Sequence, residues 1–398
     1  MNPNSPLLLS RRHLLQISGG AVFANTIPFA AQAAGSRDPR FITIVLRGAL
    51  DGLTAVPPIG DPDFFAIRGA LASRIGAPLP LTGDFALHPA MPNLARQFRA
   101  GHAMVIHAAA SPYRDRSHFD GQDVLESGQP GPGHKDSGWL NRLTLTQSGR
   151  EKIGTFKGLA VGAMTPLIMR GPAECLAWVP GLGTGSDEGL PARLMSLYKE
   201  TDPALAAAFV ASLKSQSLVS EATRPGPPSH SGAMSGVGLG MARLMARHDG
   251  PRIAALAIDG WDTHSDEVSI LKSKLAALDS LLATLETALG PVWNDTAILV
   301  ITEFGRTAAI NGTNGTDHGT GTVAFLAGGA VKGGRVIADW PGLKTNRLYQ
   351  ARDLAPTTDI RAVAKGVMQG LFDTPVSAMG QDIFPESADV APMRDLIA

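Results

Sequence analysis

Carboxylates and imidazoles stand at the ends of predicted strands in this sequence, and together they could bind a metal ion. Carboxylate oxygens and imidazole nitrogens are the ligands that hard and borderline divalent cations prefer. They therefore indicate a divalent metal site, for which zinc, manganese, calcium and magnesium all stay open. The candidate metal ligands are Asp51, Asp259, Asp262, His264, Glu303 and His318.

Each candidate ligand also has a structural interpretation. An aspartate placed after a strand, as Asp51 is, commonly closes a turn or caps a helix. Asp262 with His264 could be a helix cap followed by a surface histidine, and Glu303 could form a salt bridge with Arg306. A carboxylate at the end of a buried strand is costly, however, unless it is paired or metal-bound. Because the segments that carry these residues are all expected at one edge of a sheet, we favour the metal interpretation.

A possible nucleophile and two arginines accompany these ligands. Ser117 begins a helix predicted over 119–126, where free backbone amides stabilise an anion, although a serine there is equally a simple N-cap. Arg116 and Arg306 could hold the oxygens of a phosphate or sulfate group, or Arg116 could pair with neighbouring aspartates. His118 could be a metal ligand, a proton shuttle or a packed histidine. The candidate catalytic residues are Ser117, Arg306, Arg116 and His118.

Other polar or glycine-rich positions give weaker signals. His88 and His107 lie beside apolar segments, so we expect them to be core or edge histidines. A glycine-rich stretch over 232–240 follows no strand and does not fit a dinucleotide-binding loop. The sequence has no Gly-x-Ser-x-Gly motif, which argues against an esterase of the α/β-hydrolase type.

The elements that must position these residues predict an α/β fold with a doubly wound, mostly parallel sheet and helices on both faces. Nearly continuous apolar runs, typical of strands buried on both sides, alternate with loops and helices. Such sheets bind ligands at the carboxyl ends of their strands. No crossover helix separates the loop of His318 from the next strand, which is therefore expected to run antiparallel. We predict strands at 41–46, 103–107, 252–258, 296–301 and 323–326, and helices at 93–100, 119–126, 234–248 and 270–289.

The chain is expected to form one domain after its N-terminal segment. Residues 34–398 are numerous and apolar enough for a single core. The 45 glycines and 29 prolines of the chain suit long functional loops. A partly helical insertion is predicted at about 138–232, with helices at 190–198 and 203–218 and a linker at 222–232.

Residues 1–33 have the pattern of a twin-arginine signal peptide. Arg11 and Arg12 precede a weakly apolar segment over 17–31, and Ala31-Gln32-Ala33 fits a small-x-small cleavage site. That segment is too short and too polar for an integral membrane anchor, and we expect no second apolar run long enough for one. The twin-arginine translocase is therefore the expected partner during export, and the mature protein is expected in the periplasm or secreted.

Charge and cysteine content exclude several classes of function. The chain has 35 basic and 35 acidic residues, and loss of Arg11 and Arg12 leaves a net charge of −2. This charge gives no reason to expect nucleic acid or an anionic membrane surface as a partner. Cys175 is the only cysteine, so neither an internal disulfide nor a structural thiolate zinc site can form.

Five motifs together resemble those of a known family. They read LRGALDG, RSHF, GWDTH, TEFGRT and DHG, at 46–52, 116–119, 260–264, 302–307 and 317–319. The resemblance is to the bacterial twin-arginine-exported domain-of-unknown-function family 1501, which is grouped with the alkaline phosphatase and sulfatase superfamily. It implies a doubly wound sheet with a divalent-metal site above it. It also implies that Asp51, the loop over 259–264 and His318 supply metal ligands.

The chain departs from the superfamily pattern in three places. Glu303-Phe304 stands where the superfamily has an Asp-His pair, and Asp259 and Asp262 compete for one ligand position. No cysteine near Ser117 can become formylglycine, which argues against a standard sulfatase mechanism. These departures favour a site with one ion rather than two, or with none.

The function predicted from these residues is an exported, metal-dependent hydrolase of phosphate or sulfate esters. In this hypothesis the metal lowers the pKa of the nucleophile, either Ser117 or a water, and neutralises charge in the transition state. Arg116 and Arg306 hold the non-bridging oxygens, and the substrate is a small-molecule ester or another anionic compound. The alternative is a catalytically degenerate exported binding or assembly protein that retains the fold.

Overall fold

The apolar runs of the sequence form a nine-stranded sheet in the computed structural model, which describes residues 37–147, 156–180, 210 and 233–398. The strand order is β10-β4-β9-β8-β1-β7-β5-β6, and β11 also pairs with β4. The bounds are β1 Arg40–Arg47, β4 Ala103–Ala110, β5 Gly158–Val161, β6 Cys175–Trp178, β7 Ile253–Asp259, β8 Thr296–Ile301, β9 Thr322–Ala327, β10 Val336–Ile337 and β11 Thr358–Asp359. A separate two-stranded sheet consists of β2 (Leu79–Pro80) and β3 (Ala86–Leu87).

Most neighbouring strands of the main sheet run parallel, as predicted. β1 pairs in parallel with β7 and β8, and β5 pairs in parallel with β7 and β6. β9 runs antiparallel to both β4 and β8, which confirms the direction expected for the strand after His318. β9 therefore starts at the edge where β4 and β8 end. The carboxyl ends of β1, β4, β7 and β8 and the start of β9 share one edge of the sheet.

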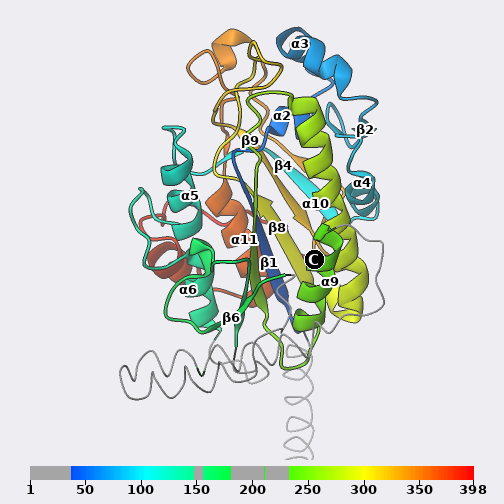
Figure 1. The fold of residues 1–398 in the computed structure, drawn as a ribbon. Helices are drawn as coiled ribbons and strands as arrows, with labels where there is room; N and C mark the ends of the chain where they lie inside the picture. The colour runs from blue at the N-terminus through cyan, green and yellow to red at the C-terminus, as the bar shows by residue number, and fades with distance from the viewer. Residues whose placement is uncertain (1–36, 148–155, 181–209, 211–232) are drawn as a thin grey trace, which may run out of the picture. The chain divides into compact units, whose positions relative to one another are not determined.

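Helices cover both faces of this sheet (Figure 1). Side chains of β1 alternate between two apolar cores: Ile42 and Ile44 pack into one core, and Phe41 and Val45 into the other. Since both faces are covered, the strands need the nearly continuous apolar runs seen in the sequence. The predicted doubly wound, mostly parallel α/β fold is confirmed. One face packs against α4 (Pro92–Arg99), α9 (Ala233–Met245) and α10 (Glu267–Leu289), and the other against α5 (His118–Ser127), α6 (Trp139–Thr146) and α11 (Ile360–Phe372).

Several short elements connect these layers. α2 follows β1 directly and opens with Asp51 as its N-cap, and α3 contains a kink at Gly69, where φ is +47°. These two helices lie at the edge of the sheet where β1 ends and β9 starts (Figure 1). Their bounds are α2 Gly52–Ala55 and α3 Phe64–Arg74, and α12 spans Val376–Ala378 near the end of the chain.

Part of the segment predicted as an insertion at 138–232 belongs to the main sheet. β5 and β6 lie within this segment and extend the parallel sheet beyond β7. The predicted helices at 190–198 and 203–218, apart from Val210, lie outside the described residues, as do the linker at 222–232 and the predicted signal peptide at 1–33.

The helix α10 and the turn after it form a long apolar segment. Residues 267–295 are long and apolar enough to cross a membrane by length and composition alone, contrary to the sequence expectation that no such run exists beyond the N-terminal segment. The leucines Leu271, Leu275, Leu278, Leu282 and Leu285 are all buried in the core that α10 shares with α9. Leucines at this spacing are typical of a helix that packs on the core of a globular domain.

Candidate metal centre

Three loops carry the candidate ligands to the edge where the parallel strands end. The loop after β4 leads into α5, which starts with His118, and the loop after β7 carries Asp262 and His264. The connection between β8 and β9 carries Glu303 and His318. β1 and β7 end in register, so the loops after these two strands leave the sheet at one level.

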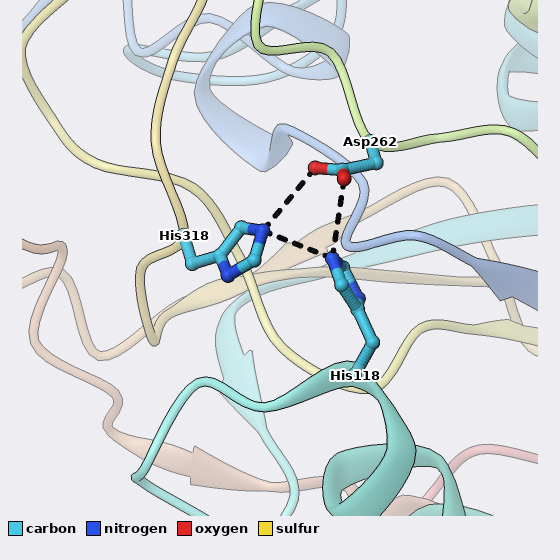
Figure 2. Close-up of side chains that lie close together, drawn as sticks. All are labelled: His118, Asp262 and His318. Atoms are coloured by element: carbon cyan, nitrogen blue, oxygen red, sulfur yellow. Dashed lines mark hydrogen bonds and ion pairs between the residues drawn. The ribbon is translucent and has the colours of Figure 1, made fainter.

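His118, Asp262 and His318 form a tight cluster at this edge (Figure 2). The Nε2 atoms of His118 and His318 lie 3.0 Å apart. Asp262 faces both rings: its Oδ2 is 3.5 Å from His118 Nε2, and its Oδ1 is 3.3 Å from His318 Nε2. The three side chains come from distant segments, and the sheet brings them together.

His264 extends the cluster toward solvent. Its Nε2 lies 3.0 Å from His318 Nε2 and 3.1 Å from Asp262 Oδ1. The side chain of His264 is 46% exposed, whereas those of His118 and His318 are 22% and 27% exposed. The cluster is therefore most accessible to solvent on the side of His264.

The other ring nitrogen of each histidine faces an oxygen atom. Carboxylate and carbonyl oxygens only accept hydrogen bonds, so each Nδ1 carries a hydrogen. In the neutral rings the Nε2 lone pairs then face one another and the carboxylate of Asp262, an arrangement that a cation stabilises. The acceptors are Glu303 Oε1 for His118 (2.8 Å), Asp317 Oδ1 for His264 (3.1 Å) and the carbonyl oxygen of Arg116 for His318 (3.0 Å).

The spacing of the donor atoms suits a small divalent ion. The Nε2 and carboxylate distances given above run from 3.0 to 3.5 Å. Ligand atoms bound tetrahedrally to zinc at about 2.0–2.1 Å lie about 3.3 Å from one another. A donor set rich in imidazole favours zinc and other transition-metal ions over Ca²⁺ and Mg²⁺, which prefer oxygen.

Glu303, predicted as a metal ligand, lies behind His118. Its Oε1 accepts hydrogen bonds from His118 Nδ1 (2.8 Å), the Gly48 amide (2.8 Å) and Gln122 Nε2 (3.2 Å). Burial raises the pKa of the Glu303 carboxyl, but these hydrogen bonds outweigh it and hold the pKa below its ordinary value. The hydrogen bond to Glu303 in turn raises the pKa of His118. Glu303 is thus a buried anion that orients an imidazole.

Arg306 holds the carboxylate of the cluster. Its Nη1 contacts Asp262 Oδ1, and its Nε donates to Thr316 Oγ1 at 3.2 Å. The structure thus pairs Arg306 with Asp262, while Glu303 is held by His118. Burial raises the pKa of Asp262, but the hydrogen bond and charge of Arg306 bring it below its ordinary value.

Asp51 is paired with Arg68, and the cluster does not include it. Both guanidinium nitrogens of the buried Arg68 contact the carboxylate, with Nη2 2.9 Å from Oδ1. Oδ1 also caps α2 by accepting from the amides of Leu53 (3.0 Å) and Thr54 (3.3 Å). Burial raises the pKa of Asp51, but the charge of Arg68 lowers it to about 2. The helix-cap interpretation of Asp51 therefore describes its position.

Asp259 ends β7 at an exposed position and is not part of the cluster. Its backbone carbonyl accepts a hydrogen bond from Lys274 Nζ at 2.7 Å. Asp262 supplies the carboxylate of this loop, which approaches β1 closely at Gly48. There φ is +115°, and an added Cβ would lie 2.6 Å from the Asp262 amide nitrogen. Gly48 thus allows the loop of Asp262 to reach its place.

Glu267 is a buried acid that the sequence analysis did not single out. Its Oε1 lies 2.9 Å from Thr54 Oγ1, and its Oε2 lies 2.7 Å from Thr316 Oγ1. Burial and then the charge of Asp51 raise the pKa of Glu267 well above its ordinary value. It links Thr54 beside Asp51 to the threonine that holds Arg306. In the sequence, only its spacing of four residues from the apolar Leu271 indicated that Glu267 lies on the buried face of its helix.

Ser117 and Arg116 lie immediately before His118. Ser117 is the N-cap residue of α5, and its side chain makes no capping hydrogen bond to the first turn. The guanidinium of Arg116 binds Asp353, with Nε 2.8 Å from Oδ2, and Gln350, with Nη2 2.6 Å from Oε1. Ser117 is therefore adjacent to the centre, whereas the charge of Arg116 is balanced by Asp353.

The remaining histidine and aromatic positions have packing roles. His88 and His107 are buried, at 1% and 0% exposure, which confirms them as core histidines. Phe304, which stands where the resemblance implied an imidazole, stacks on His118 with ring centroids 4.9 Å apart and an interplanar angle of 28°. Phe304 supports the ring of His118 from its apolar side.

Comparison with solved structures gives low similarity over most of the chain. Ps i-CgsB in complex with k-i-k-neocarrahexaose has a TM-score of 0.41 and 12% identity, covering 90% of this chain and 75% of that chain. Phosphonate monoester hydrolase of Agrobacterium radiobacter has a TM-score of 0.37 and 10% identity, covering 75% and 70%. Alkaline phosphatase from the Antarctic bacterium TAB5 has a TM-score of 0.35 and 14% identity, covering 76% and 95%.

Sequence comparison gives a clearer result than structural comparison. The sequence has no match among curated proteins. A family model matches residues 79–375, a range that includes four of the five motifs identified in the sequence. The chain therefore belongs to the family described as Protein of unknown function (DUF1501).

Proposed function

We propose that this chain is an exported, metal-dependent hydrolase of phosphate or sulfate esters. The observation that supports this most is the convergence of Nε2 atoms from three histidines, His118, His264 and His318, on the carboxylate of Asp262. Zinc suits this donor set best. When bound, a divalent ion supplies a Lewis acid that polarises an ester oxygen and offsets negative charge in the transition state.

Ser117 is the proposed nucleophile. Its side chain is not used to cap α5, and it precedes His118 at the start of that helix. The free amides of the first turn and the positive end of the helix dipole lower the energetic cost of negative charge at this position. The same amides suit the oxygens of a phosphate or sulfate group.

The roles proposed for the two arginines change with the geometry. Arg306 contacts Asp262, and Arg116 contacts Asp353. Because both guanidinium groups are engaged by carboxylates, we assign them to holding the protein rather than to binding substrate oxygens. Attraction of an anionic substrate then comes from the ion and from the N-terminus of α5.

Export through the twin-arginine translocase is proposed on the sequence pattern of residues 1–33. Export of folded protein suits a centre whose donors come from distant segments, because the ion can be captured before transport. Replacement of Arg11 and Arg12 together by lysine is expected to leave the protein in the cytoplasm. Cell fractionation of the variant and the parent checks this, and equal periplasmic amounts would contradict the proposed route.

Two observations favour a second function, that of an exported binding or assembly protein without catalysis. Asp51, a ligand by resemblance, contacts Arg68 through both oxygens, and Phe304 replaces an expected imidazole. A second ion would find neither donor at that place. If hydrolysis needs two ions, a chain with this pairing retains binding and loses turnover.

The first experiment is elemental analysis of the mature protein purified from the periplasm. The parent is expected to hold one equivalent of zinc per chain, and His118→Ala and His318→Ala are expected to hold little. Arg96→Ala, which removes an ion pair between α4 and Glu286 of α10, is the control and is expected to keep the metal. Absence of metal from the parent would contradict the proposed centre.

A screen of phosphate and sulfate esters then separates the two functions. The loaded parent is expected to hydrolyse at least one ester, and Ser117→Ala is expected to lose turnover while keeping its zinc. Full zinc occupancy without hydrolysis of any ester supports the binding function instead. Unchanged turnover in Ser117→Ala would leave the metal proposal intact and remove Ser117 as the nucleophile.

A further inference from the structure

We propose that Arg116 is a positioning residue whose strained backbone, clamped by Asp353, sets the carbonyl oxygen that orients His318. This inference rests on the proposed function, in which His318 is a metal ligand. It concerns the main chain of Arg116 as well as its side chain. The guanidinium, in this view, acts on the centre without touching substrate.

The backbone of Arg116 has an unfavourable conformation. Its φ is +61°, in the left-handed region, where a residue with a Cβ is strained and glycine is not. Such a conformation persists only where surrounding contacts hold it. Here it occurs two residues before His118, at the turn between the loop after β4 and α5.

The contacts that hold Arg116 are made by its own side chain. Nε lies 2.8 Å from Asp353 Oδ2, Nη2 lies 2.6 Å from Gln350 Oε1, and the guanidinium carbon lies 5.8 Å from the ring centroid of Tyr349. The Arg116 side chain is 20% exposed and that of Asp353 is fully buried. A planar guanidinium held on several sides fixes the residue that carries it.

Asp353 is itself anchored to the segment of His318. The amide of Tyr349 donates to the Asp353 carbonyl at 2.8 Å, and the Asp353 amide donates to the Tyr349 carbonyl at 3.0 Å. The next residue, Leu354, accepts at its carbonyl from Thr320 Oγ1 (3.0 Å) and from the Gly321 amide (3.0 Å). Thr320 follows His318 by two residues. The same hydrogen bonds therefore hold both His318 and Asp353, the partner of Arg116, in place.

The consequence reaches His318 through one hydrogen bond. The Arg116 carbonyl oxygen lies 3.0 Å from His318 Nδ1. This acceptor keeps the hydrogen on Nδ1 and turns Nε2 toward Asp262. If Arg116 relaxed to negative φ, its peptide plane would rotate and the acceptor would leave Nδ1. The strained backbone of Arg116 therefore fixes the tautomer and the orientation of His318.

The test compares Arg116→Ala with Arg116→Gly. Both variants remove the clamp, but only glycine keeps easy access to positive φ. We therefore expect the His318 tautomer and the zinc affinity of Arg116→Gly to be closer to those of the parent than those of Arg116→Ala are. If only the length of the side chain mattered, glycine would have the larger effect. Asp353→Asn, which removes the charge of the clamp, is expected to lie between the parent and Arg116→Ala. Arg96→Ala, which removes an arginine outside the metal cluster, is the control.

The first readout is the tautomer of His318, measured by imidazole ¹⁵N NMR on metal-free full-length mature protein, with His318→Gln to assign the signal. The parent is expected to show the Nδ1–H tautomer, and Arg116→Ala a mixture. The second readout is zinc affinity by competition with a chromophoric chelator. Loss of a group that orients a metal-binding histidine typically weakens binding about 10- to 100-fold, so we expect about a 10-fold loss for Arg116→Ala and less for Arg116→Gly.

The two readouts separate this inference from the proposed function. Failure of the parent to bind zinc contradicts the metal centre, while the tautomer comparison still decides the role of Arg116. A single Nδ1–H tautomer in Arg116→Ala overturns the inference, as does a greater effect of Arg116→Gly than of Arg116→Ala. Circular dichroism on each variant verifies that the chain is folded.

Discussion

Oε1 of Glu303 lies 2.8 Å from Nδ1 of His118, so a fully buried carboxylate stands directly behind an imidazole whose Nε2 faces His318 and Asp262. A carboxylate in this position makes the imidazole a stronger donor to a cation and fixes its ring orientation. Sequence reasoning placed Glu303 at the metal. In the structure Glu303 instead lies behind His118 and orients the ring of this proposed metal ligand.

The first prediction concerns this pair. Glu303→Gln keeps an oxygen that can accept from His118 but removes the negative charge, so zinc affinity is expected to fall about 10-fold. Chelator competition at fixed pH measures it. Glu286→Gln, which alters an ion pair on α10, should bind zinc as the parent does. An unchanged affinity in Glu303→Gln would mean that the charge of Glu303 does not act on the centre.

The second prediction concerns the pairing of Asp51 with Arg68. Arg68→Met leaves the Asp51 carboxylate buried without its counter-charge, and breaking a buried pair in this way costs about 3–5 kcal/mol. The double variant Asp51→Asn, Arg68→Met is expected to recover part of this loss because no buried charge is left. Urea denaturation of the three proteins gives the comparison. A double variant as unstable as Arg68→Met would show that charge is not the cause.

The third prediction concerns pH and the buried His107. Its Nε2 donates to the Val56 carbonyl (2.9 Å), and its Nδ1 accepts from the Ala108 amide (2.8 Å). Burial lowers the pKa of His107 from 6.5 to about 4. Below pH 6.5 the unfolded chain takes up a proton that the folded chain refuses, so stability falls as pH drops from about 6.5 to about 4.

The size of this effect and its control follow from the same shift. For a fully buried group the loss amounts to about 3 kcal/mol at pH 4 relative to pH 7. His107→Gln keeps a donor and an acceptor and does not titrate, so its stability should fall less over that range. His88, whose pKa burial also lowers to about 4, contributes to the slope that remains. Equal pH dependence in the parent and His107→Gln would refute this assignment.

The fourth prediction concerns the close approach at Gly48. In Gly48→Ala the added methyl meets the Asp262 amide nitrogen and the Trp261 amide nitrogen, at 2.6 and 2.8 Å. The loop must move, so both stability and zinc affinity should fall. Gly101→Ala is the matched control, because Gly101 also has positive φ, +80°, but no atom within 4 Å of an added Cβ.

These two glycine variants separate backbone strain from crowding. Gly101→Ala is expected to cost roughly 1–2 kcal/mol from strain alone and to leave zinc binding unchanged. Gly48→Ala adds a steric cost of roughly 1–3 kcal/mol and displaces a metal donor. Thermal unfolding with and without zinc measures both terms. If the two variants lose the same stability and bind zinc equally, the added methyl at Gly48 is accommodated without displacing Asp262.

The strands were predictable to within a few residues because each is a continuous apolar run buried on both faces. The strands at 296–301 and 103–107 are examples: the first matches β8, and the second is extended by three alanines in β4. β5 and β6 escaped prediction because each has only four residues, and so short a strand leaves no periodic signal. Helix and strand type is a local property, whereas membership of the sheet is not.

The location of the candidate site could be predicted from the sequence, but the contacts between its residues could be predicted only in part. The strand ends gave the edge, and Asp262, His264 and His318 meet there. Asp51 has the same local sequence signal, but its outcome depends on Arg68, which α3 brings to it from 17 residues away. His118 stayed ambiguous in sequence because its two nitrogens acquire different neighbours only in the folded chain. Pairing between elements decides these cases, and a single sequence does not encode it locally.

The antiparallel strand β9 has a consequence for the order of events during folding. His118 and His318 are 200 positions apart in the chain, and their rings meet only when β9 has inserted between β4 and β8. Contacts of such long sequence separation close late and slowly. Capture of the proposed ion would therefore require a completed sheet, so we expect metal binding to follow folding and not to nucleate it.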